Sequence, residues 1–221
     1  MLIKKRAFNL EEEALLASGI QERSKIVFYV AELDQIYEQF LRQRLLPPDA
    51  LDRARALFTW LWISKPDRYK PHGSYKFNEV IEAQLKEDVR SVGNCLGLTL
   101  LYNCLLRRMD ISAEALYLEN AFGVGPHVLT LLKIETSFID IENILPDGFD
   151  YRGHHSHPER AGWGDRELIA DIYLSVANEL FEKGNFLEAL KNYDRAIAFN
   201  PRYEKAHLNK AILLDRMGKE R

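Results

Sequence analysis

The stretch SVGNCLGLTLLYNCLL, residues 91–106, holds both cysteines of the chain, and the expected fold is built around it. Asn94 is a good N-cap, and the apolar residues after it recur at helical spacing, so a helix is expected to begin at Cys95. The second thiol, Cys104, is nine residues further on, which places it on the opposite face of that helix. The two thiols therefore have different expected roles: Cys104 is a small core residue, and Cys95 is a candidate nucleophile.

Cys95 is the first member of a predicted catalytic set. Unpaired backbone N–H groups and the positive end of the dipole at a helix start favour a thiolate. A nucleophilic thiol also needs a base, and the base needs an orienting group. His127 begins one predicted strand and Asp140 lies in the next, which gives the catalytic residues Cys95, His127 and Asp140 in chain order. Glu142 shares the strand face of Asp140 and Asn143 is adjacent, so either is an alternative third member.

The roles of these residues follow from acyl-transfer chemistry. His127 is expected to take the thiol proton, and Asp140 to fix the imidazole tautomer and stabilise its charge. The backbone N–H of Cys95 would donate to the oxyanion of the tetrahedral intermediate. For the second oxyanion donor the candidates are Asn94 and Tyr75.

The segments on either side of this helix predict an α+β fold. Before this helix, apolar residues recur at steps of three and four, which predicts three helical segments, 24–46, 50–64 and 78–85. Asp49 is the expected N-cap of the second segment and Asn78 that of the third. Beyond Asp110 the period changes to two, which predicts strands over 111–119, 127–134 and 137–144. The expected core is a central helix on a largely antiparallel sheet.

The C-terminal part contains an internal repeat. Ala177 and Ala211 are 34 residues apart, as are Gly184 and Gly218, and this is the period of tetratricopeptide (TPR) repeats. One full repeat is expected over residues 170–203, followed by the first helix of another. One and a half repeats are too few to form a stable solenoid alone. Three arrangements are therefore expected as alternatives: the repeats dock on the core, they pair with a second chain to form a homo-oligomer, or they continue in a longer natural protein. A ligand groove on their inner faces would include the side chains of Asn178, Asn209 and Lys210.

The stretches GNCLGLTLLYNCLLRRMDI (93–111), PHVLTLL (126–132) and FIDIENILPDGFDY (138–151) resemble the core of the transglutaminase-like superfamily of papain-like cysteine enzymes. The helical lead-in ARALFTWLWISKPDRY (54–69) is similar to the segment that precedes the cysteine in that superfamily. The resemblance is to the bacterial and archaeal branch in which TPR repeats follow the core. It implies an α+β core with Cys95 at the start of a central helix, and acyl chemistry through a thioester, as hydrolysis of an amide or peptide bond or as transfer to an amine.

The expected organisation is a cysteine-enzyme domain over residues 1–150, a linker over 151–166 and a TPR segment over 167–221. The linker overlaps a region, residues 146–165, that has no clear period and contains the run RGHHSHPE at 152–159. This run predicts a solvated loop rather than a metal site, because no second cluster of Cys or His stands at suitable spacing. No metal and no cofactor are therefore expected.

Composition narrows the class of protein. The net charge is -3 and the pI is about 6.1, which does not favour a nucleic-acid or membrane partner. Two cysteines make no disulfide framework, so a reducing, cytoplasmic setting is expected. The partners expected instead are protein or peptide ligands: a substrate and a TPR partner. The rival hypothesis is a catalytically inactive core of the same fold, acting through its repeats as a protein-interaction module.

Overall fold

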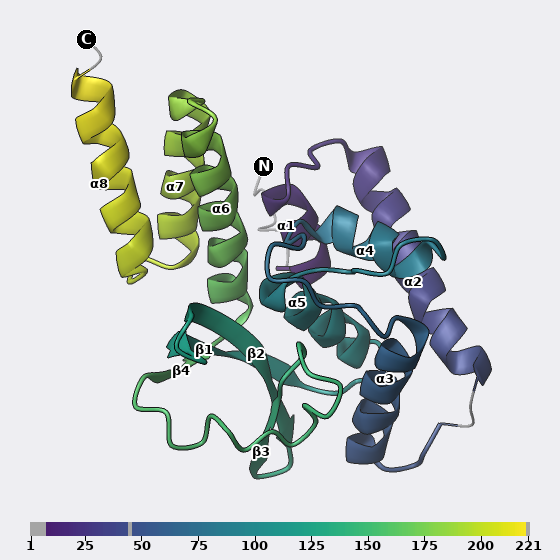
Figure 1. Cartoon of the computed structure of the whole chain (residues 1–221). Coiled ribbons are helices and arrows are strands. Elements are labelled where there is room, and N and C mark those ends of the chain that lie inside the picture. The colour runs from purple at the N-terminus through teal and green to yellow at the C-terminus, as the bar shows by residue number, and fades with distance from the viewer. Residues whose placement is uncertain (1–7, 44–45, 220–221) are drawn as a thin grey trace, which may run out of the picture.

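The computed structural model describes residues 8–43 and 46–219, which form eight helices and one four-stranded antiparallel sheet (Figure 1). The elements in chain order are α1 (Leu10–Ala17), α2 (Arg23–Gln43), α3 (Ala50–Ser64), α4 (Phe77–Leu85), α5 (Cys95–Arg107), β1 (Ala113–Ala121), β2 (Gly125–Ile134), β3 (Ser137–Ile141), β4 (Arg160–Trp163), α6 (Asp165–Glu182), α7 (Phe186–Phe199) and α8 (Glu204–Lys219). In the described part of the chain, no helix is both long and apolar enough to span a membrane.

Helix α5 is the centre of the core. Every residue from Leu96 to Leu106 is buried, as expected for a helix that is apolar on all sides. One side of α5 packs on β1 and β2, and α3 and α4 contact it elsewhere. The strand order is β3-β2-β1-β4, so the two strands under α5 are the inner strands of the sheet. The predicted central helix on an antiparallel sheet is confirmed.

Most predicted elements are found close to their expected bounds. Helix α3 begins after Asp49, whose Oδ1 accepts hydrogen bonds from the N–H groups of Leu51 and Asp52, at 2.8 and 3.2 Å. The N-cap assigned to Asn78 is wrong: α4 begins one residue earlier, at Phe77, and its N-cap position is Lys76, which makes no side-chain cap. Asn78 therefore lies in the first turn of the helix.

The region over residues 146–165 is not entirely a loop. It contains β4, which pairs with β1 in the register Leu118↔Arg160 to Ala115↔Trp163 and forms one edge of the sheet. Four residues are too few to show the alternating pattern of a strand in the sequence. The strand forms because it pairs with β1 in the tertiary structure. The segment predicted as a linker, residues 151–166, thus belongs in part to the sheet.

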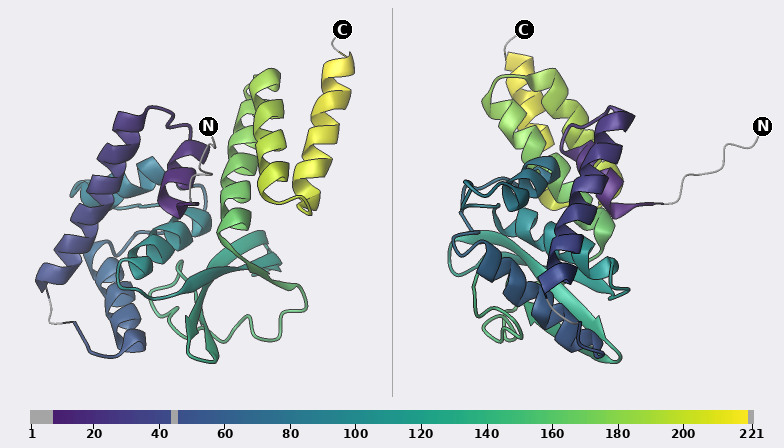
Figure 2. Two further views of the ribbon diagram at one scale, coloured as in Figure 1. Left: turned by 180° about the vertical axis from the view of Figure 1, so that it is seen from behind. Right: turned by 90° about the vertical axis from the view of Figure 1, so that its right-hand side faces the viewer.

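Helices α6, α7 and α8 lie side by side, with α8 farthest from α1–α5 (Figure 2). They dock on the core: α6 packs on α1 and on β4, and Arg107 of α5 forms a salt bridge with Asp165 at 2.5 Å. The indole of Trp163 stacks on Tyr117 with ring centroids 4.1 Å apart and meets Tyr203 edge-on at 5.4 Å. Of the three arrangements considered for the repeats, the structure shows docking.

This joint contains a carboxyl group whose titration affects stability. Burial raises the pKa of Asp171 from 3.8 to about 6, although the hydrogen bond from Tyr203 Oη, 2.6 Å long, and the charge of Lys205 act in the opposite direction. Because the pKa of Asp171 is raised in the folded state, the protonated carboxyl group contributes to the free energy of unfolding. This contribution is complete below pH 3.8 and is lost as the pH rises through about 6.

We predict that Asp171→Asn stabilises the chain above pH 6, by roughly 1–2 kcal/mol, because the amide oxygen still accepts from Tyr203 but does not ionise. The measurement is the urea midpoint at pH 8 and at pH 5, where the gain should shrink. Asp215→Asn is the control, since Asp215 is exposed on α8. Equal pH dependence of wild type and Asp171→Asn would contradict the assignment.

Candidate active site

Cys95 occupies the position expected of a nucleophile. It is the first residue of α5 and is half-buried, and Oδ1 of the N-cap Asn94 accepts a hydrogen bond from the Gly97 N–H at 3.1 Å. The preceding loop packs tightly here, because a Cβ on Gly97 would lie 2.6 Å from the carbonyl oxygen of Ser74. Cys104 is fully buried, and burial raises the pKa of its thiol well above the usual value. The expected core role of Cys104 is confirmed.

His127 connects the thiol to a carboxylate. The ring is 6% exposed, and its Nε2 lies 2.9 and 2.8 Å from the two carboxylate oxygens of Glu142. Cys95 lies near enough to the ring to raise the pKa of His127. Because Nε2 faces Glu142, Nδ1 is the ring nitrogen left for the thiol. Cys95, His127 and Glu142 thus lie together, and a hydrogen bond joins His127 to Glu142.

Asp140, predicted as the third member, does not contact His127. It is 1% exposed and forms a two-pronged salt bridge with Arg160, at 2.7 and 3.0 Å. The register of β2 with β3 explains this, since Asp140 pairs with Leu131, four residues along β2 from His127. Glu142 is two residues further along the chain, just past the end of β3, and so lies nearer to the ring. The alternative that named Glu142 is the one that fits the geometry.

The charged forms of His127 and Glu142 stabilise each other. Burial alone would lower the pKa of His127, but its interactions with Cys95 and Glu142 outweigh burial and raise that pKa to about 9. Burial alone would raise the pKa of Glu142, but hydrogen bonds from His127, His154 and the backbone of Ile144 lower it. An imidazolium is thus favoured between a sulfur and a carboxylate.

His154 is a further residue of the candidate site that the sequence did not reveal. It is 4% exposed, and its Nε2 lies 3.1 Å from Glu142 Oε2, so one carboxylate is shared by two imidazoles. The loop between β3 and β4, residues 142–159, carries it there. The prediction that RGHHSHPE is a solvated loop is therefore wrong for His154, although His155 is exposed and His157 is half-buried.

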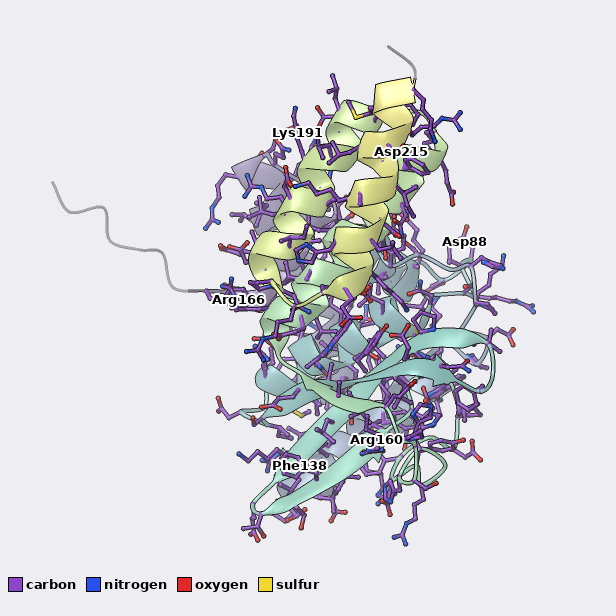
Figure 3. All side chains as sticks on the ribbon, turned by 90° about the vertical axis from the view of Figure 1, so that its left-hand side faces the viewer. Asp88, Phe138, Arg160, Arg166, Lys191 and Asp215 are labelled. Atoms are coloured by element: carbon purple, nitrogen blue, oxygen red, sulfur yellow. The ribbon has the colours of Figure 1, made fainter. Side chains whose placement is uncertain are left out.

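Backbone pairing fixes the path of the β3–β4 loop. The Glu142 N–H donates to the Gly148 carbonyl at 2.8 Å, and the Tyr151 N–H donates to the Asp140 carbonyl at 2.9 Å. A Cβ on Gly148 would stand 2.0 Å from the carbonyl oxygen of Glu142, so this close return requires glycine. Arg160, seen beside this loop in Figure 3, also donates to the His154 carbonyl at 2.8 Å. The Asp140–Arg160 pair therefore holds the loop that delivers His154.

Of the two sequence candidates for the second oxyanion donor, Tyr75 already donates elsewhere, whereas Asn94 caps the helix through its Oδ1 and keeps its amide N–H groups as possible donors. The Tyr75 hydroxyl donates to Glu179 on α6 at 2.8 Å, and the Asn94 side chain caps α5. A different tyrosine, Tyr69, is half-buried, and its pKa is raised by burial and then by the negative charges of Cys95 and Glu142. Tyr69 is thus a protonated phenol, and its backbone pairs with Gly93, two residues before Cys95.

Asn143, the other alternative third member, supports α5 instead. Its amide donates to the hydroxyl oxygens of Thr99 on α5, at 3.2 Å, and Thr130 on β2, at 2.9 Å. Thr130 in turn donates to Asn103 Oδ1 at 2.6 Å, and the Asn103 amide donates to the Glu114 carbonyl at 3.2 Å. This buried network fastens the turn after β3 to the helix that carries Cys95.

The proposed groove residues of the repeats are only partly brought together. Asn178 Oδ1 accepts hydrogen bonds from Tyr193 Oη, at 2.8 Å, and from the Asn209 amide, at 2.9 Å, and all three residues line a hollow of about 260 Å³. Lys210 is not among its lining residues and pairs with Asp194 at 2.6 Å.

Comparison with known proteins identifies one part of the chain. The family model described as TPR repeat matches residues 177–218, which cover the end of α6, all of α7 and nearly all of α8. No curated protein and no solved structure matches the chain. The prediction of a TPR segment is confirmed, and such repeats generally mediate contacts between proteins.

The supporting network gives a stability prediction. Thr130→Val leaves buried donors and acceptors of Asn143 and Asn103 without a partner, so we expect unfolding to become easier by about 2–3 kcal/mol. Thr59→Val is the matched control, because the Thr59 hydroxyl donates to a carbonyl within the exposed face of α3, and its cost should stay within about 0.5 kcal/mol. Urea denaturation measures both. Equal costs at the two sites would contradict the network.

Proposed function

We propose that this chain is a cysteine-dependent acyl-transfer enzyme that works through a thioester, with TPR helices that recruit a protein partner. The observation that carries the proposal is the grouping of Cys95, His127 and Glu142 at the N-terminus of a buried helix, with His127 hydrogen-bonded to Glu142. Nucleophile, base and orienting acid are the three parts that this chemistry requires.

In the proposed reaction, His127 holds the proton of Cys95, and the thiolate attacks the carbonyl carbon of an amide or peptide bond. The backbone N–H of Cys95 and the Tyr69 hydroxyl donate to the oxyanion that forms. His127 then passes its proton to the leaving amine, and the thioester remains on Cys95. Water or a second amine, deprotonated by His127, attacks the thioester and frees the thiol.

The resemblance to the transglutaminase-like superfamily supports this assignment. The chain order is the same, with cysteine at the start of a central helix, then histidine, then an acid on an antiparallel sheet. The acid in contact with histidine is Glu142 here. A glutamate performs the same task as an aspartate, because both fix one tautomer and stabilise the imidazolium charge.

The position of α6 supports a role for the repeats in substrate recruitment. A second hollow, of about 380 Å³, is lined by Asn94, by the loop before α4 and by α6 residues that include Asn178 and Glu182. Asn178 and Glu182 also line the TPR hollow. A polypeptide bound along α6 would therefore pass next to the residue that precedes Cys95.

Thiol alkylation tests the proposal against the rival hypothesis of an inactive protein-binding core. In EDTA-treated protein at pH 7, iodoacetamide should modify Cys95 roughly tenfold or more faster than an ordinary thiol, which is only about 3% ionised there. Peptide mapping should show Cys104 unmodified, because it is buried. His127→Ala should return Cys95 to the ordinary rate. A wild-type rate no faster than that would favour the inactive core.

Matched amide variants separate the two acids in the same assay. Glu142→Gln removes the charge beside His127 and should slow alkylation by roughly tenfold, or about 1.4 kcal/mol. Asp140→Asn should leave the alkylation rate nearly unchanged and instead lower stability by about 3 kcal/mol, since it breaks a buried ion pair. The reverse pattern would show that Asp140 orients the base.

A further inference from the structure

The shared carboxylate of Glu142 has a second chemical use. His127 Nε2, a Glu142 oxygen and His154 Nε2 all lie within 4.8 Å of one another. The three side chains are 6%, 0% and 4% exposed. They come from β2, from the turn after β3 and from the middle of the β3–β4 loop, so the tertiary fold creates the cluster. We propose that His127, Glu142 and His154 bind a divalent transition metal ion such as Zn²⁺, and that the bound ion switches off Cys95.

The donor set suits this class of ion. Two imidazole nitrogens and one carboxylate oxygen form a common three-residue zinc set, with a fourth position open to water. With bonds of about 2.0–2.1 Å, neighbouring ligand atoms of a tetrahedral site are roughly 3.3 Å apart. Oε2 of Glu142 lies 2.8 Å from His127 Nε2 and 3.1 Å from His154 Nε2, so these two pairs need to open by only a few tenths of an ångström. The ligand nitrogens of the two histidines already lie within 4.8 Å of each other.

The surroundings leave the cluster available. The nearby guanidinium of Arg160 is engaged by Asp140 and by the His154 carbonyl rather than by Glu142. Phe122, in the β1–β2 hairpin, contacts both imidazole rings, with centroids 5.6 and 4.8 Å away, and is itself half exposed. Tyr151 also meets the His154 ring, with centroids 5.0 Å apart. The two histidines therefore lie directly beneath an exposed aromatic side chain, so the path of an ion from the surface is short.

The effect on Cys95 follows from where the proton of His127 lies when a metal ion is bound. This part of the inference rests on the proposed function. A metal ion on Nε2 of His127 uses that lone pair, and the neutral ring then carries its proton on Nδ1. Nδ1 has no lone pair left to take the proton of Cys95. The ion also replaces the protons through which both imidazoles hold Glu142, so binding releases protons. Metal-bound protein should therefore contain an unactivated thiol.

Cobalt provides the direct test of binding. The full chain, freed of metal with EDTA and desalted, is titrated with Co²⁺ and followed by its visible absorption, and Zn²⁺ is then added as competitor. We expect one Co²⁺ per chain, displaced by Zn²⁺. His154→Gln keeps a donor for Glu142 but loses the ligand, and should weaken binding by roughly tenfold or more. His155→Ala, at an exposed neighbour, should bind as wild type does.

Alkylation of Cys95 with and without Zn²⁺ tests the consequence. In wild type, Zn²⁺ should slow alkylation by roughly tenfold, EDTA should restore it, and in His154→Gln the ratio of the two rates should fall toward one. The absence of a cobalt spectrum, or equal affinity in His154→Gln, would overturn the metal site. Equal slowing by Zn²⁺ in His154→Gln would place the ion on the thiol and overturn the switch. If cobalt binds but Cys95 in metal-free protein is alkylated no faster than an ordinary thiol, the metal site is upheld and the proposed function is overturned.

Discussion

The arrangement of this protein depends on a buried carboxylate that two imidazoles hold from different parts of the chain. Glu142 has no solvent exposure, and an isolated charge in such a place would be strongly unfavourable. Contacts from His127 and His154 make the carboxylate tolerable there. The same contacts fix the orientation of His127, and thereby decide which ring nitrogen faces Cys95. Stability and chemistry thus rely on the same three side chains.

The rest of the fold holds these side chains in place. The network from Asn143 through Thr130 to Asn103 ties the turn after β3 to α5, and Asp140 with Arg160 ties the β3–β4 loop to the sheet. On the other side, α6 docks against the core next to the start of α5. This docking gives the TPR helices a fixed position relative to Cys95, as the proposed recruitment of a protein partner requires. The exposed apolar side chains of α8, Leu208, Ile212 and Leu214, leave a surface for a protein contact there.

Local pattern predicted most of the secondary structure and two members of the candidate site. Asp49 and Asn94 are strong caps, and the change of period after Asp110 marks the start of the sheet, so these elements follow from neighbouring residues alone. The choice between Asp140 and Glu142 depends on strand register, and two acids two residues apart look alike in a sequence. The position of His154 depends on the path of the β3–β4 loop, which is set where Gly148 approaches Glu142 closely. The formation of β4 depends on its pairing with β1, which is distant in the sequence. Such tertiary constraints leave no periodic signal.

The most direct test of the central claim is a ¹⁵N NMR spectrum of the histidine rings in metal-free protein at neutral pH. The account predicts that both ring nitrogens of His127 carry protons, with Nε2 bonded to Glu142, and that Cys95→Ser, which removes the acidic thiol, shifts the Nδ1 resonance toward that of an unprotonated nitrogen. A neutral His127 ring whose resonances are the same in wild type and in Cys95→Ser would contradict it, because the imidazole would then not share a proton with the sulfur.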